Sequence, residues 1–172
     1  GFGDNAAAAD CDIVVIATPW DSAATTVQEN ADRLDGKIVV SMANALVRVG
    51  GEFQPLLPPR GSVAAHVQAA VPNCRVVAAF HHLPAKELGH LGEPIDSDVL
   101  ICGDDPGALA AISEIVARIP GCRPLDAGEL SNATAIEAFT AVLLQLNVRY
   151  KTRVAPKLTG IRSVRAGAAN ST

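Results

Sequence analysis

The chain has 172 residues, a formal net charge of −4 and 49% hydrophobic residues, which suffices for the core of one domain. No apolar run approaches the roughly 18 residues of a membrane helix, no signal-peptide pattern is present, and the acidic balance argues against nucleic acid as a partner. Four cysteines without CxxC or CxxH spacing predict free thiols in a cytoplasmic protein, although disulfides stay possible.

Short apolar runs alternate with helical segments through the first half of the chain. The expected elements are a helical turn at residues 4–10, a strand at 12–17, a helix from about 22 to 34, a strand at 37–41, a loop at 49–61, a helix at 62–70 and a strand at 75–80. Asp21 or Ser22 should cap the second of these helices, because both side chains accept hydrogen bonds from unpaired N–H groups. Three prolines exclude a regular helix from the loop.

The second half continues the alternation. We expect strands at residues 99–102 and 122–125 and helices at 106–119 and 130–150, the first helix burying a stripe of Leu109, Ile112, Ile115 and Val116. Alternating apolar strands and helices are typical of an α/β fold in which helices cover both faces of a parallel sheet.

Polar or aromatic side chains follow three of the predicted strands. Thr18-Pro19-Trp20 ends the first, Ser41-Met42-Ala43-Asn44 the second, and His81-His82-Leu83-Pro84 the third. Ligands of open α/β sheets bind beyond the carboxyl ends of the strands, so these segments predict a shared ligand rim. The competing interpretation is that each histidine is a satisfied loop residue and that Trp20 fills a gap in the packing.

Few residues in the sequence suit acid–base, nucleophilic or metal chemistry. His81 and His82 are consecutive, so their side chains should diverge and cannot easily share a metal ion. Lys86 is either a general acid or a solvated side chain, and Glu137 is expected on a solvated helix face rather than in a catalytic role. We therefore predict neither catalytic residues nor metal ligands.

A dinucleotide-binding sheet normally carries a glycine-rich loop between a strand and a full helix. The opening G-F-G-D-N-A matches that pattern in letters only, because no strand precedes it and the helix after it is too short. We expect either that the phosphate loop and the first βαβ unit lie outside this chain, which alone would then bind NADP weakly, or that the chain never bound a dinucleotide.

Five strings together resemble the NADPH-dependent reductases of the deazaflavin coenzyme F420. They are DIVVIATPW, KIVVS, VVAAFHHLPA, VLICGDD and RPLDAGELSN, and the resemblance covers about residues 6–161. It implies a Rossmann-like fold, with a long C-terminal helix, that transfers a hydride between NADP(H) and coenzyme F420. Residues 1–161 would form the incomplete reductase domain, and residues 162–172 a disordered tail. The alternatives are an imine or ferric reductase of the same superfamily, or a truncated assembly domain without activity.

The resemblance also implies a set of cofactor contacts. The nicotinamide would contact Trp20, Ala24, Leu46 and Ala85, and the deazaflavin ring would lie near His81, Leu83 and Pro84. Thr18, Pro19 and His82 complete the candidate cofactor-binding set, although His82 stands where the family usually has a small polar residue.

In a direct hydride transfer between two cofactors, the protein mainly has to orient the cofactors and exclude water. The partners expected from these residues are therefore small-molecule cofactors. The apolar helix at 130–146 suggests a homodimer, and Arg149, Lys151 and Arg153 form a candidate contact for the anionic tail of the coenzyme.

Overall fold

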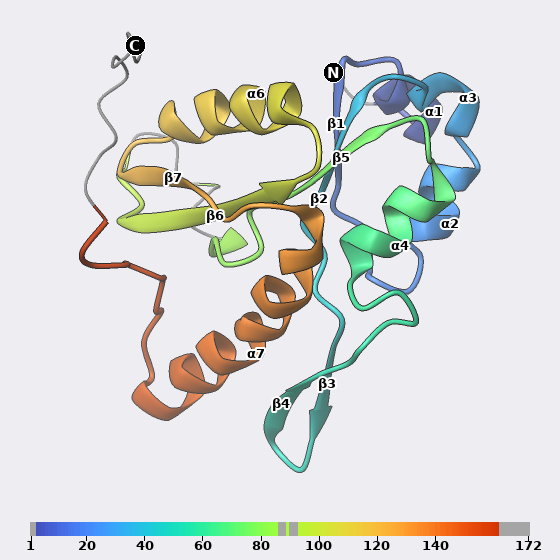
Figure 1. Ribbon diagram of the computed structural model, residues 1–172. Helices are drawn as coiled ribbons and strands as arrows, with labels where there is room; N and C mark the ends of the chain where they lie inside the picture. The colour runs from blue at the N-terminus through green and yellow to red at the C-terminus, as the bar shows by residue number, and fades with distance from the viewer. Residues whose placement is uncertain (1–2, 86–88, 90–92, 162–172) are drawn as a thin grey trace, which may run out of the picture.

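A five-stranded sheet in the order β1-β2-β5-β6-β7 forms the centre of the computed structural model, which describes residues 3–85, 89 and 93–161 (Figure 1). The strands are β1 Ile13–Ile16, β2 Ile38–Ser41, β5 Arg75–Ala78, β6 Ser97–Gly103 and β7 Cys122–Asp126. The first three run parallel, and their last residues Ile16, Ser41 and Ala78 are level with one another. The carboxyl ends of β1, β2 and β5 therefore meet at one edge, as predicted.

The other two strands run in the opposite direction. Ala78 of β5 pairs with Cys102 of β6 in an antiparallel ladder, and β7 then runs parallel to β6. The sheet is mixed rather than wholly parallel, because the chain leaves β5 and enters β6 at the same edge. Alternation of strands and helices in a sequence does not encode strand direction, so this reversal was not predictable from the pattern.

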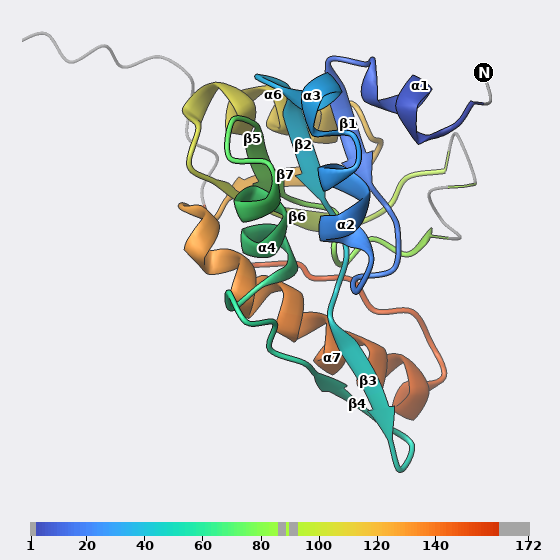
Figure 2. The ribbon, with the colours of Figure 1, turned by 90° about the vertical axis from the view of Figure 1, so that its right-hand side faces the viewer.

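Helices cover both faces of the sheet, which confirms the Rossmann-like expectation (Figure 2). The helices are α1 Asn5–Ala9, α2 Ala23–Gln28, α3 Ala31–Leu34, α4 Val63–Ala70, α6 Pro106–Ala117 and α7 Ala133–Tyr150, with a 3-10 turn η1 at Leu130–Asn132. α2, α4 and the start of α7 enclose one hydrophobic cluster, which includes Val27, Val67 and Ile136. α6 covers the other face with Ala108, Ile112 and Val116.

Details of two helices differ from the expectation. The helix expected from about 22 to 34 is divided at Glu29 and Asn30 into α2 and α3, and the hydroxyl of Ser22 donates to the Pro19 carbonyl (3.0 Å) instead of capping. On α6, Ile115 is exposed, and the buried stripe falls on Ala108, Ile112 and Val116. These three residues are spaced four apart, so they lie along one face of the helix.

The expected loop at residues 49–61 contains a hairpin that the prediction missed. β3 (Leu46–Val49) pairs antiparallel with β4 (Glu52–Pro55) through Gly50 and Gly51, whose φ values are 57° and 94°. Two consecutive glycines with positive φ suit a two-residue hairpin turn whose twist matches that of the strands. The hairpin packs on α7, where the Phe53 N–H donates to the side chain of Gln145 (3.3 Å).

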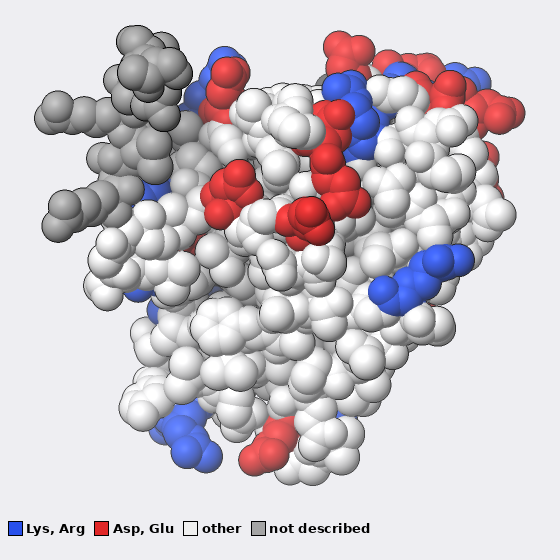
Figure 3. Space-filling view, viewed as in Figure 1, with Lys and Arg blue, Asp and Glu red and all other residues white. Residues whose placement is uncertain are grey.

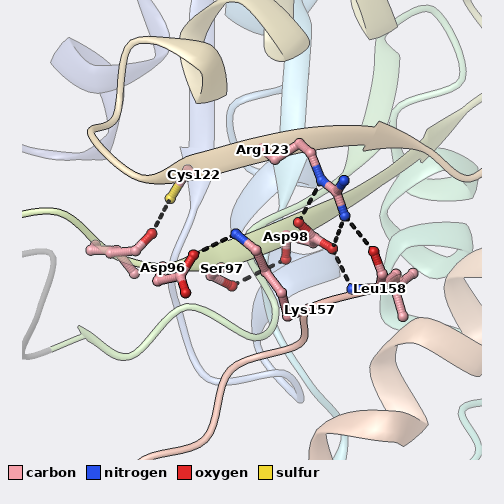
Figure 4. A network of polar contacts seen from close by, with 8 residues as sticks. Asp96, Ser97, Asp98, Cys122, Arg123, Lys157 and Leu158 are labelled. Atoms are coloured by element: carbon pink, nitrogen blue, oxygen red, sulfur yellow. Dashed lines mark hydrogen bonds and ion pairs between the residues drawn. The ribbon is translucent and has the colours of Figure 1, made fainter. Parts of the chain in front are cut away.

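The segment after α7 is tied to β6 through one buried carboxylate (Figure 4). Asp98 is fully buried and accepts from the Arg123 guanidinium at 2.8 and 2.6 Å and from the Leu158 N–H at 2.5 Å. The Asp98 N–H in turn donates to the Pro156 carbonyl (2.8 Å). The hydrogen bond from Arg123 lowers the pKa of Asp98 despite its burial.

Within the residues that the structure describes, no helix has the length and apolar character needed to span a membrane. The proposed tail at 162–172 lies outside those residues.

Candidate functional site

Unpartnered polar atoms gather at the carboxyl edge of the three parallel strands. Thr18 follows β1, Ser41 ends β2 and His81 follows β5. In the described part of the chain, the buried side-chain nitrogens and oxygens that lack a hydrogen-bond partner are Thr18 Oγ1, Ser41 Oγ and both ring nitrogens of His81. Buried polar groups are nearly always paired in folded proteins, so a cluster of unpaired ones at a single edge indicates a place that receives a ligand.

His81 sits in a tight turn whose backbone is strained. Phe80, the residue before it, has a φ of 67°, which is rare for a bulky side chain and costs on the order of 1–2 kcal/mol. The turn closes with a hydrogen bond from the Leu83 N–H to the Phe80 carbonyl (3.2 Å). Such strain collects at ligand sites, where the surrounding structure enforces it.

The imidazole of His81 is neutral at physiological pH. Only 6% of the residue is exposed, and burial, followed by the neighbouring His82, lowers its pKa to about 3. A neutral imidazole has one N–H donor and one acceptor nitrogen. His81 can therefore hydrogen-bond to a heterocycle or an amide, but it holds no transferable proton as a general acid near pH 7.

His82 points to α7 instead. Its Nε2 lies 2.8 Å from the Ile136 carbonyl, and its ring meets the edge of Phe139 with centroids 5.5 Å apart. Because a carbonyl only accepts, Nε2 carries the proton. The two histidine rings diverge as predicted, with centroids 6.3 Å apart, and no metal-binding cluster occurs among the described residues.

Asn44 belongs to the predicted ligand rim, although the sequence interpretation gave it no contact of its own. Its Nδ2 donates to the His81 carbonyl (3.3 Å), and its Oδ1 accepts from the Thr140 hydroxyl (2.9 Å). Its place shortly after β2 was the signal for including it, because a polar residue beyond a strand end is a candidate for the ligand rim.

The remaining predicted site residues fall into separate places. Trp20 and Ala24 line a cavity of about 130 Å³ whose other walls are Asp21, Thr25, Pro58, Pro59, Val63 and His66. Thr18 lines a second cavity of about 60 Å³ beside β1, α1 and α2. Neither lining includes the histidine pair.

The rest of the predicted set surrounds the histidines in sequence. Leu46 begins β3 and is half-buried, Leu83 is buried in the cluster under α6, and Pro84 is half-buried. Pro19 and Ala85 are exposed. Lys86, the alternative general acid, lies outside the described residues.

Glu137 corrects a sequence-based expectation, because it is buried rather than solvated. Only 4% of it is exposed, and its two carboxylate oxygens accept from the Val63 N–H (2.8 Å) and the Ala64 N–H (3.0 Å) at the start of α4. Burial raises the pKa of Glu137 to about 7, against the opposing effect of the two N–H donors. The carboxylate joins α7 to α4.

Within the described part of the N-terminal glycine motif, Asp4 has a structural role. The Asp4 carboxylate accepts from the Ala7 N–H (2.9 Å) and caps the five-residue helix α1. It therefore occupies the position that a phosphate would need.

Comparison with known proteins gives matches over nearly the whole chain. A family model described as NADP oxidoreductase coenzyme F420-dependent matches residues 2–45. The F420-dependent NADP reductase of Methanocaldococcus jannaschii is 36% identical over 164 residues, which is 94% of this chain and 72% of that protein. The F420-dependent NADP reductase of Methanothermobacter thermautotrophicus is 31% identical over 151 residues, 86% of this chain and 65% of that protein.

A solved structure supports the same relationship. The crystal structure from Arthrobacter sp. FB24, described as a candidate F420-dependent NADP reductase, has a TM-score of 0.76 and 25% identity. The match covers 90% of this chain and 74% of that one. The chain thus spans between 65% and 74% of the length of these three relatives.

Proposed function

The chain belongs to the F420-dependent NADP reductase family, and we propose that it transfers a hydride between NADP(H) and coenzyme F420. The observation that carries this proposal is the edge where β1, β2 and β5 end, with its four unpartnered polar atoms on Thr18, Ser41 and His81. Heterocycles with carbonyl and N–H groups on their edges fit such atoms.

In this proposal the side chains at the edge bind and orient two flat rings. The nicotinamide supplies or receives the hydride, and the deazaflavin is its partner. Trp20, Ala24, Leu46 and Ala85 form the nicotinamide side, and Thr18 and Pro19 shape the turn that leads to it. On the deazaflavin side, neutral His81 offers hydrogen bonds, and His82, Leu83 and Pro84 exclude water.

Hydride transfer between two bound rings depends on their distance and alignment rather than on a nucleophile. This is consistent with the pKa of His81, which burial lowers to about 3, so that the ring is neutral near pH 7. We assign no residue of this chain a catalytic acid or base role.

The test is to mix the purified protein with NADPH and oxidised coenzyme F420 and to follow the visible absorption band of the deazaflavin. We expect the band to bleach, and we expect His81→Ala to weaken F420 binding while Glu114→Ala, a change on the exposed side of α6, leaves it intact. An unchanged band together with NADPH-dependent turnover of a cyclic imine or of Fe(III) would favour the alternative reductases. No turnover of any of the three would favour an assembly role.

A homodimer is the proposed assembly. Phe139, Val142 and Tyr150 are exposed on α7, and Val47 and Val49 are exposed on the adjacent hairpin. Figure 3 shows a broad face with few charged side chains over α7 and this hairpin. A second copy of the same face would cover these apolar side chains by a two-fold contact. The four free thiols suit a reducing compartment, which supports a cytoplasmic location.

A further inference from the structure

Asn44 connects three elements that are far apart in the sequence. It follows β2, its Nδ2 donates to the carbonyl of His81 after β5 (3.3 Å), and its Oδ1 accepts from Thr140 on α7 (2.9 Å). The carbonyl can only accept, so the amide must present its NH₂ group to His81 and its oxygen to the Thr140 hydroxyl. The hydrogen-bond chain has a single consistent direction, from Thr140 through Asn44 to His81.

α7 thereby supports the histidine turn at two points. Thr140 acts through Asn44 on the His81 carbonyl, and the Ile136 carbonyl receives the ring N–H of His82 (2.8 Å). Residues 136 and 140 lie one helical turn apart on the same face of α7. One helix therefore holds both the His81 carbonyl, through Asn44, and the side chain of the next residue, His82.

His81 needs such external support. Its ring nitrogens make no hydrogen bond of good geometry among the described residues, and the backbone at Met42 and Ala43 gives the ring only a weak polar contact. The preceding residue, Phe80, has a left-handed backbone with φ 67° that the turn would leave if it were free. The position of the imidazole consequently depends on the backbone contacts of the turn.

We propose that Asn44 and Thr140 are positioning residues that set the place of the His81 imidazole for the hydride transfer. This inference rests on the proposed function, because it takes His81 as a contact of the deazaflavin ring. Neither residue is placed against a reacting atom. Both act through the His81 carbonyl, and a small displacement of a ring-orienting side chain is enough to slow a reaction that depends on alignment.

The test compares Thr140→Val with Thr134→Val, a matched change on the same helix at a hydroxyl for which the structure gives no hydrogen bond. We expect Thr140→Val to lower kcat for F420 reduction about tenfold with an unchanged KM for NADPH. Thr140→Ser should restore the rate, and Thr134→Val should match the wild type. Asn44→Asp keeps the acceptor for Thr140 but loses the N–H donor to the His81 carbonyl. We expect it to lower kcat about as much as Thr140→Val does.

A second readout does not depend on activity. The imidazole signals of His81 in ¹H–¹⁵N spectra should shift in Thr140→Val and Asn44→Asp and stay unchanged in Thr134→Val. Suppose that the wild type reduces F420 and that the variants change neither kcat nor these signals; the positioning role is then refuted. Shifted signals together with an unchanged kcat would refute it as well. A wild type that fails to reduce F420 refutes the proposed function, while the spectra still decide whether Asn44 and Thr140 hold His81.

Discussion

The buried carboxylate of Glu137 makes a quantitative prediction about stability against pH. Burial raises its pKa from the ordinary 4.5 to about 7, so the folded protein binds this proton more tightly than the unfolded chain does. The corresponding stabilisation is fully present below pH 4.5 and is lost as the pH rises through 7. One pKa unit corresponds to about 1.4 kcal/mol, so ionising Glu137 in the folded state costs about 2 to 3 kcal/mol between pH 5 and pH 8.5.

Glu137→Gln removes this titration and keeps the size of the side chain. At pH 5 the protonated acid and the amide each offer one good acceptor to the Val63 and Ala64 N–H groups, so the two proteins should have similar free energies of unfolding. At pH 8.5 only the wild type carries a buried charge. We expect the free energy of unfolding of Glu137→Gln, relative to wild type, to rise by about 2 to 3 kcal/mol over this range.

The assay is urea unfolding followed by circular dichroism at a series of pH values, with Glu114→Gln on the exposed side of α6 as the matched control. His81 gives the free energy of unfolding a pH dependence of the opposite sign. Because its pKa is lowered in the folded protein, its contribution to stability is present above pH 6.5 and is lost as the pH falls towards 3. That contribution is the same in all three proteins and cancels in the difference. A difference that stays flat, or that falls with pH, would refute the reasoning and would mean that the two N–H donors outweigh burial.

Two further predictions concern the C-terminal segment and the assembly. Asp98→Asn should make tryptic cleavage at Lys157 roughly tenfold faster, because losing one charge-assisted hydrogen bond corresponds to about that factor. The control, Asp96→Asn, breaks only the exposed ion pair with Lys157 and should change the cleavage rate little. Equal cleavage rates for the two variants would contradict the anchoring role of Asp98. Val142→Lys should raise the dissociation constant of the dimer about 100-fold or more, because an unpaired lysine would be buried at the interface. Light scattering measures this as a fall in the molar mass in solution. A molar mass equal to that of the wild type would exclude the α7 face as the contact.

Part of what the structure revealed was present in the sequence. The alternating residues around Gly50-Gly51 are a recognisable hairpin signal, and the prolines that followed drew attention away from it. The direction of β6 was not available in the same way. Its apolar residues satisfy a buried strand equally well in either direction, and only its pairing with β5 settles the choice.

Glu137 shows a second limit of the sequence. A single carboxylate within an apolar helix is more often solvated, and its burial depends on α4, whose first N–H groups lie more than seventy positions earlier in the chain. The same holds for Asn44, whose two partners come from different elements. Such contacts form only when packing brings distant segments together.

The sequence by itself determined that three apolar strands end in polar segments, and the parallel pairing of β1, β2 and β5 places those ends at one edge as expected. It also contained the strings that resemble the F420-dependent reductases. Tertiary structure alone decided which side chains at this edge lack partners, that His82 contacts α7, and that Asn44 and Thr140 support His81. Local pattern follows from the chain's own periodicity, whereas the partner of a polar side chain is set by long-range packing.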